Sequence, residues 1–232
     1  MIYVTSDLHG YPLNKFKKLL KKADFGEEDF CFVLGDVIDR GKDGIKTILW
    51  LMNQPNFELV LGNHESMMLD CDFVCEDITH ESIAALTEEK LDIYYTWLAN
   101  GGETTLRELH KLSKRKRKNV FGFLREAPLY ESVIVNGRDF ILTHSGFGSF
   151  DKNKKLSEYS PYDLIWNRPS LETRYFDDIT TVFGHTPTLI YGNKFMDKAI
   201  FTETWIDIDT GAAGGGAPML LRLDDLKEFY AD

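Results

Sequence analysis

The sequence predicts an α/β protein whose first part forms a parallel sheet. Three short β-rich runs, Ile2–Thr5 and residues 30–34 and 57–61, alternate with helical segments at residues 13–23 and 44–52. The segment 13–23 places its apolar residues at the spacing of an amphipathic helix, whereas residues 30–34 form an unbroken apolar run that ends at a glycine. Units of strand, helix and strand build parallel sheets through right-handed crossovers.

The middle of the chain is mostly helical. Helical signals occur at residues 82–99 and 103–112, within a segment that extends from about residue 65 to residue 127. We therefore expect one domain spanning residues 1–232, with residues 65–127 as a helical cap inserted into it.

Strand signals return in the last part of the chain. Residues 131–135 and 139–143 flank Asn136-Gly137, a pair typical of a type I′ hairpin turn. The polar segment 151–178 is expected to be loop with one short helix. Further strands are expected at residues 180–183, 199–201, 205–208 and 219–223.

Composition excludes several classes of protein. Of the 232 residues 43% are hydrophobic, which is enough for a full core and unlike a disordered chain. A net charge of −10 disfavours broad binding to nucleic acids or anionic membranes. No apolar run is long enough to span a bilayer, no secretory signal is recognisable, and three cysteines make no disulfide framework. We expect a reduced, cytoplasmic protein without nucleic-acid or membrane partners.

Polar clusters follow the predicted strands. Residues 7–10 (DLHG), 35–41 (GDVIDRG) and 62–65 (GNHE) come after the first three strands, and His144 and His185 come after two later ones. Binding sites in open α/β sheets form beyond the carboxyl ends of the strands, so these clusters lie where a site is expected.

Carboxylate, amide and imidazole donors of this kind suit manganese, iron or zinc better than magnesium or calcium. The spacing of Asp7 and His9 places both side chains on one side if the strand continues. Asp7 and His9 are predicted to bind a first metal. Asn63, His144 and His185 are predicted to bind a second metal, and Asp36 is predicted to bridge the two.

The motifs resemble those of the PPP family of calcineurin-like metallophosphoesterases, in particular its bacterial serine/threonine protein phosphatase branch. The family signatures GDxHG, GDxxDRG and GNHE and two later histidines stand here as SDLHG, GDVIDRG, GNHE, THSG and GHTP. Residues 97–106, 164–168 and 208–211 are also similar, so the resemblance spans nearly the whole chain. Ser6 replaces the usual glycine and Ser145 a common alanine, but neither change removes a ligand.

The resemblance implies a four-layered α/β/β/α sandwich with two divalent transition metals, for which manganese is favoured and iron or zinc are alternatives. Two cations about 3.5 to 4 Å apart lower the pKa of a bridging water, and the resulting hydroxide attacks phosphorus in line. His64 is the candidate general acid, a role that contributes about 10²- to 10⁴-fold in rate. The family pattern makes Asp39 its orienting partner, and Arg40 and Arg168 can grip phosphate oxygens bidentately.

Several of these residues have simpler interpretations. Asp39 and Arg40 could form an ordinary surface salt bridge, and Arg168 could be an exposed loop residue. We interpret Glu65 as a first-turn carboxylate of a helix and give residues 209–211, which could form a turn, no role.

Two further features lie in the helical middle. Cys71 and Cys75 are interpreted as buried structural residues, because no second cysteine pair completes a zinc site. The basic run at residues 114–118 is expected to be a solvated face or loop, with steering of a phosphorylated substrate as the alternative.

The expected function is hydrolysis of phosphomonoesters, with protein phosphoserine and phosphothreonine as substrates. The alternative is a bis(5'-nucleosyl)-tetraphosphatase that hydrolyses diadenosine tetraphosphate, because that bacterial branch shares the motifs. Tyr94, Tyr95 and Trp97 are more typical of core than of a base-stacking surface, which favours the protein substrate, whereas the basic run favours a polyphosphate. A third hypothesis, an inactive metal-binding scaffold, is disfavoured because the ligands and the acid are all present.

Overall fold

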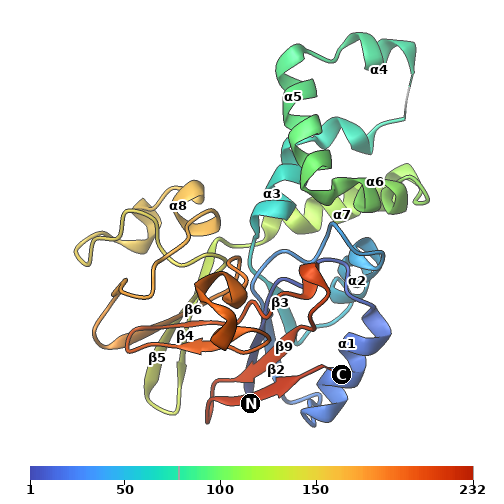
Figure 1. Ribbon diagram of the computed structural model, residues 1–232. Helices are drawn as coiled ribbons and strands as arrows, with labels where there is room; N and C mark the ends of the chain where they lie inside the picture. The colour runs from blue at the N-terminus through green and yellow to red at the C-terminus, as the bar shows by residue number, and fades with distance from the viewer. Residues whose placement is uncertain (78, 232) are drawn as a thin grey trace.

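The computed structural model describes residues 1–77 and 79–231, whose strands form two five-stranded sheets (Figure 1). The order in the first sheet is β10 (Lys227–Tyr230), β9 (Met219–Arg222), β1 (Ile2–Thr5), β2 (Phe30–Val33) and β3 (Phe57–Leu59). The order in the second sheet is β4 (Tyr130–Val135), β5 (Arg138–Thr143), β6 (Ile179–Phe183), β8 (Trp205–Asp207) and β7 (Ile200–Phe201).

The parallel core of the first sheet follows from the predicted alternation of strands and helices. Strands β1, β2 and β3 pair in parallel, and the helices α1 (Leu13–Lys22) and α2 (Gly44–Leu51) connect them. Strand β9 adds to the other side of β1 in the antiparallel sense. In the second sheet β5, β6 and β8 are parallel, and β4 joins β5 through the predicted hairpin. Asn136 and Gly137 both have positive φ, which confirms the type I′ turn.

Neighbouring residues of β1 face opposite sides of the sheet and belong to different cores. Tyr3 packs with helix residues such as Phe16, while Val4 packs between the two sheets with Phe32 and Val182. Because both faces of the first sheet are buried at its centre, the central strands β1 and β2 are largely apolar rather than alternating.

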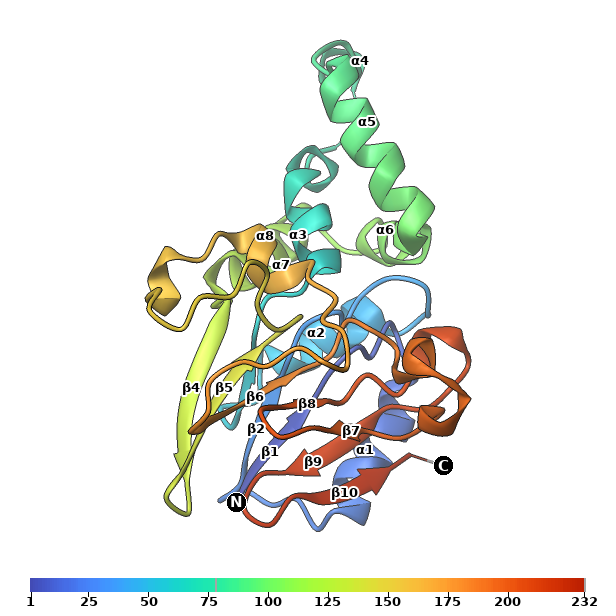
Figure 2. The same ribbon diagram turned by 60° about the vertical axis from the view of Figure 1, so that its left-hand side comes forward.

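The molecule has the four layers of an α/β/β/α sandwich, as expected. Helices α1 and α2 cover the outer face of the first sheet, and the two sheets pack on each other (Figure 2). The outer face of the second sheet is covered by residues including Tyr159, Leu164 and Tyr175, from a segment that contains the short helix α8 (Pro161–Ile165). This fourth layer is mostly irregular chain, in keeping with its polar sequence.

The segment between β3 and β4 forms the helical cap. Its helices are α3 (Asn63–Asp70), α4 (His80–Ala84), α5 (Glu88–Trp97), α6 (Glu103–Leu109) and α7 (Lys114–Glu126). Helices α4 and α5 rise away from the sheets, while α6 and α7 lie across the base of the cap (Figure 1). Among the described residues, no helix is long and apolar enough to cross a membrane.

Three elements differ from the sequence-based expectation. The single helical signal at 82–99 is two helices, because Thr87 caps a new helix by accepting the N–H of Lys90. Helix α7, capped by Ser113, was not expected as an element of its own; its first five residues are the basic run, all exposed except Arg117, so the expected solvated face is confirmed. Strand β10 was missed, because its sequence KEFY alternates too briefly to be distinguished from a turn.

Candidate metal centre and phosphate site

The predicted ligands meet at one edge of the two sheets, beyond the strand ends. Asp7 and His9 follow β1, Asp36 follows β2, and Asn63 begins α3 after β3. From the second sheet, His144 follows β5 and His185 follows β6. All six side chains are buried. Residues far apart in sequence are therefore brought together by the common direction of the parallel strands.

The backbone of this edge is held in unusual conformations. Left-handed φ values between +41° and +69° occur at Asp7, His9, Asp36, Asp39, Arg40 and His185. Such a conformation costs a residue with a side chain about 1–2 kcal/mol, so strain is concentrated at the predicted site. It also corrects the expectation for Asp7 and His9: β1 ends at Thr5, and the loop rather than a continued strand places Asp7 Oδ1 3.8 Å from His9 Nε2.

Asp36 lies between two groups of donors. Its Oδ2 is 3.5 Å from His9 Nε2, and its Oδ1 is 3.4 Å from His144 Nε2. On the second side, His144 Nε2 is 2.9 Å from Asn63 Oδ1 and 3.2 Å from His185 Nδ1. The two oxygens of one carboxylate thus face two separate sets of ligand atoms.

The backbone orients the histidines with a nitrogen towards the cluster. His144 Nδ1 donates to the carbonyl of Leu34 at 2.7 Å, and His9 Nδ1 lies 3.2 Å from the carbonyl of Ile38. In each ring the Nε2 atom is left to face the carboxylates. A carbonyl that fixes the other ring nitrogen is the usual arrangement for a metal-binding imidazole.

The cluster combines strongly shifted pKa values with buried polar atoms that lack a partner. Burial would lower the pKa of His144, but the carboxylate of Asp36 raises it to about 10. Burial raises the pKa of Asp7 well above its usual value. Within the described part of the chain, Asp7 Oδ1 and His185 Nε2 are buried without a hydrogen-bond partner. An unpaired buried polar atom costs about 1–3 kcal/mol, so the donor set fits bound divalent cations.

His64 lies beside this cluster and forms a pair with Asp39. Its Nδ1 donates to Asp39 Oδ2 at 2.6 Å, while its Nε2 is 3.8 Å from Asp36 Oδ2. Burial would lower the pKa of His64, but Asp36 and Asp39 together raise it. By distance alone, one ion could be held by His9, Asp36 and His64. A second ion could be held by Asp36, His144 and His185. The hydrogen bond to Asp39 is what distinguishes His64 from the other histidines.

The two predicted phosphate-binding arginines stand on either side of the cluster. Arg40 places Nη1 3.2 Å from His9 Nε2 and Nη2 3.2 Å from His64 Nε2. Arg168 donates from Nη1 to the carbonyl of His185 and to the Thr186 hydroxyl. Both residues are exposed to solvent. The Arg40 guanidinium thus contacts two imidazoles of the cluster, whereas Asp39, its partner in the alternative interpretation, is buried and bonded to His64.

Glu65 was interpreted from the sequence as a first-turn helix carboxylate and Asp209 was given no role, yet both are buried here. Glu65 is 0% exposed and accepts the backbone N–H groups of Asp36, Val37 and Ile38 at 2.7, 2.8 and 3.2 Å. It lies in the first turn of α3, as expected, but it also anchors the loop that carries Asp36. The charge of Asp209 contributes to the raised pKa of Asp7, which places Asp209 near the site.

The basic run is bound to the cap itself. Lys114 and Lys118 pair with Glu76 at 2.5 and 3.0 Å. Arg117 is buried and donates to the carbonyl of Cys75 and to Asp77 Oδ1 at 2.9 and 2.6 Å. These contacts join α7 to the turn after α3. Cys71 and Cys75 are free and buried in the same core, which confirms their structural interpretation.

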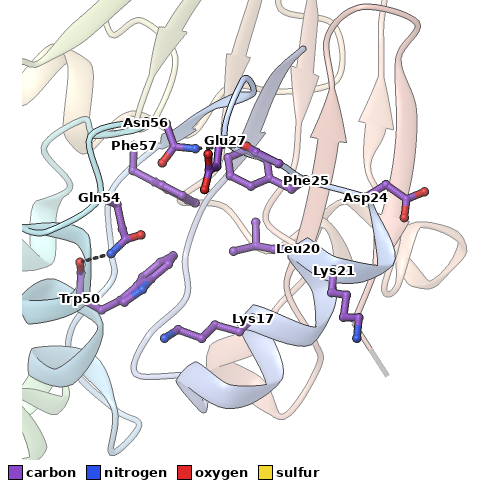
Figure 3. Close-up of a pocket in the computed structure, with 11 residues that line it drawn as sticks. Lys17, Leu20, Lys21, Asp24, Phe25, Glu27, Trp50, Gln54, Asn56 and Phe57 are labelled. Atoms are coloured by element: carbon purple, nitrogen blue, oxygen red, sulfur yellow. Dashed lines mark hydrogen bonds between the residues drawn. The ribbon is translucent and has the colours of Figure 1, made fainter.

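A hollow of about 520 Å³ lies at the opposite end of the first sheet, where β3 begins (Figure 3). Trp50, Phe57 and Phe25 form part of its wall, with Lys17 Nζ 5.0 Å from the Trp50 ring. None of the predicted site residues lines it. The candidate metal centre is therefore separate from this hollow.

Comparison with known proteins agrees with this geometry. The family model for calcineurin-like phosphoesterases matches residues 1–208. The chain belongs to the calcineurin-like phosphoesterase family. It is accordingly a metal-dependent phosphoesterase, and its His/Asp cluster fits the divalent metals of that family.

Similar proteins carry two kinds of name. Serine/threonine-protein phosphatase 2 of Salmonella typhimurium (strain LT2) is 27% identical over 93% of this chain and 89% of that protein. An asymmetrical bis(5'-nucleosyl)-tetraphosphatase of Halalkalibacterium halodurans is 25% identical over 97% of this chain and 90% of that protein. The crystal structure of a proposed diadenosine tetraphosphatase has a TM-score of 0.67 at 14% identity and covers 99% of this chain and 92% of that one. The fold is thus shared, whereas the names do not agree on a substrate.

Proposed function

We propose that this phosphoesterase hydrolyses phosphoserine and phosphothreonine in proteins. The observation that carries the proposal is the pair of exposed guanidinium groups, Arg40 and Arg168, beside an acid and a metal-type cluster. A guanidinium pair is suited to the oxygens of one phosphate. Similarity over nearly the full chain to a serine/threonine-protein phosphatase supports the same substrate.

The ligand assignment that we propose follows the two faces of Asp36. Asp7, His9 and Asp36 would hold one cation, and Asp36, Asn63, His144 and His185 the other. Mixed oxygen and imidazole donors favour manganese, with iron or zinc as alternatives. When bound, such cations stabilise the charge of the phosphate and acidify a water molecule.

The protein's own groups then position the ester and supply a proton. Arg40 and Arg168 bind phosphate oxygens, which places the leaving oxygen near His64. His64 Nε2 gives its proton to that oxygen as the phosphorus–oxygen bond breaks, while Asp39 keeps the Nδ1 proton in place. The carboxylate thereby stabilises the charged imidazole and fixes its orientation.

The structure of the basic run also favours the protein substrate. A polyphosphate clamp needs cations that are free to meet the ligand. Lys114, Arg117 and Lys118 instead neutralise Glu76 and Asp77 of the cap.

The second candidate, hydrolysis of diadenosine tetraphosphate, is favoured by one specific feature. The ring of Tyr162, which is 71% exposed, stacks on that of Trp166, with ring centroids 6.5 Å apart and an angle of 23°. Trp166 in turn meets the edge of His185 at 6.1 Å. An exposed stacked pair beside the site can bind a planar base.

The test compares substrates under identical metal conditions. The protein is freed of metal with a chelator and reconstituted separately with manganese, iron or zinc. We expect kcat/KM for a phosphoserine peptide to exceed that for diadenosine tetraphosphate, and Tyr162→Ala to change peptide turnover little. If the dinucleotide is the better substrate and Tyr162→Ala selectively slows its cleavage, the second candidate is correct.

A further inference from the structure

The helical cap contacts the hydrogen-bonded pair of His64 and Asp39 at the point where α5 meets α6. Helix α5 ends at Trp97, a turn kinked at Gly101 spans Leu98–Gly102, and α6 follows. Trp97 and Thr105, one on each side of this turn, are buried and point at the same carboxylate, that of Asp39. Asp39 lies 58 and 66 positions away from them in the sequence.

The Asp39 carboxylate is completely enclosed by these groups. Its Oδ1 accepts the Thr105 hydroxyl at 2.6 Å, and its Oδ2 accepts both Trp97 Nε1 at 3.0 Å and His64 Nδ1 at 2.6 Å. Hydrogen bonds to a carboxylate are stronger than those between neutral groups. With each oxygen held, the carboxylate cannot rotate away from the imidazole.

The same turn holds the backbone of the loop. Asp39 and Arg40 are consecutive residues with φ of +69° and +65°, a conformation that costs each about 1–2 kcal/mol. The Asp39 N–H donates to the Thr105 hydroxyl at 2.9 Å, and the Arg40 N–H donates to the Gly101 carbonyl at 3.0 Å. Gly101 itself has a φ of +104°, and a Cβ there would lie 2.7 Å from Arg40 Cγ. The backbone of the cap therefore approaches Arg40 as closely as a glycine allows.

We propose that Trp97, Gly101 and Thr105 are positioning residues for the general acid, so that the helical cap is part of the catalytic machinery. Thr105 fixes Asp39 by backbone and side chain at once, and Trp97 directs Oδ2 towards His64. This inference rests on the proposed role of His64. In that step the oxygen of a water molecule bonds to phosphorus and loses a proton to solvent, the electron pair of the ester phosphorus–oxygen bond moves onto the leaving oxygen, and the His64 Nε2 proton goes to that oxygen. A proton from solvent then restores the acid.

A purely structural role predicts a different pattern of rates from a positioning role. A general acid matters when the leaving oxygen is strongly basic, as in a phosphoserine peptide. It matters little for p-nitrophenyl phosphate, whose anion leaves without a proton. Loss of positioning lowers kcat for the peptide selectively, whereas a general loosening of the fold lowers both rates together.

The test is Thr105→Val, which keeps the shape of the side chain and removes its hydroxyl. The matched control is Thr96→Val on the exposed face of α5. We expect kcat for the peptide to fall on the order of 10-fold or more in Thr105→Val, and kcat for p-nitrophenyl phosphate by less than about 3-fold. Thr96→Val should leave both rates unchanged, and Thr105→Ser, which restores the hydroxyl, should recover most of the peptide rate.

Further measurements distinguish a failure of the positioning inference from a failure of the proposed acid role of His64. His64→Asn should show the same selectivity as Thr105→Val but more strongly; if it slows both substrates equally, the acid role itself is wrong. If His64→Asn is selective and Thr105→Val is not, the positioning inference is overturned. Should Thr105→Val fail to fold, Trp97→Phe with Tyr95→Phe as its control gives the same comparison. In ¹⁵N-histidine-labelled protein, the His64 Nδ1 proton should shift in the Thr105 or Trp97 variant and not in the controls; an unchanged signal also overturns the inference.

Discussion

Replacing Glu65 by glutamine tests whether this buried carboxylate anchors the metal-site loop. Glu65 Oε2 accepts the N–H of Asp36, and Oε1 accepts those of Val37 and Ile38. A glutamine of the same shape can present its oxygen to one side only. Its NH₂ group then faces at least one buried N–H, which is left without an acceptor.

The expected loss of unfolding free energy in Glu65→Gln follows from these contacts. An unsatisfied buried donor costs about 1–3 kcal/mol, and a lost hydrogen bond costs about 0.5–1.5 kcal/mol more. We therefore expect Glu65→Gln to lose about 2–4 kcal/mol of unfolding free energy. If Glu65 acted only through the dipole of α3, the loss would be about 0.3–1 kcal/mol.

Thermal unfolding of the metal-free protein followed by circular dichroism measures the effect. For a chain of this size, about 3 kcal/mol corresponds to a fall in Tm of roughly 6–12 °C. The control is Glu88→Gln, which changes an exposed carboxylate in the first turn of α5. Equal and small shifts for both variants would refute the anchoring role and restore the simple helix-terminus interpretation.

Three other predictions concern the acid, a phosphate-binding arginine and the basic run. His64→Ala should lower kcat by about 10²- to 10⁴-fold while metal content stays constant; equal loss of metal and rate would make His64 a ligand. Arg168→Ala should raise KM and lower kcat, and wild-type kinetics would reduce that residue to a loop charge. Arg117→Ala should lower Tm because it loses its buried contacts to Cys75 and Asp77, whereas the exposed Lys116→Ala should not. A selective loss of dinucleotide cleavage in the folded Arg117 variant would instead make the run a phosphate clamp.

Local sequence pattern was sufficient for every strand except β10 and for the set of candidate ligands. Asp36 and Asn63 follow apolar runs that end at glycine, and the carboxyl ends of parallel strands meet at one edge. The parallel arrangement of β1, β2 and β3 then follows from the alternation with helices. The convergence of these ligands thus depends on the order of elements and not on any long-range signal.

The supporting contacts depended on tertiary structure and were not predictable. Nothing near Thr105 or Trp97 in the sequence indicates that their side chains reach Asp39, because the approach depends on how the cap packs on the loop. Glu65 likewise resembles any first-turn carboxylate until the loop folds over it. The solvated face of the basic run was predictable, but helix α7 was not, because the charges at its start conceal the buried stripe that includes Val120 and Leu124.

Anomalous X-ray scattering from manganese-reconstituted crystals tests whether two cations share the Asp36 carboxylate, as we propose. We expect two anomalous peaks per chain. One should lie among Asp7, His9 and Asp36, and the other among Asp36, Asn63, His144 and His185, with His64 bound to neither. A single peak in fully active protein would contradict the shared carboxylate, and a peak bound by His64 Nε2 would contradict the acid role of that residue.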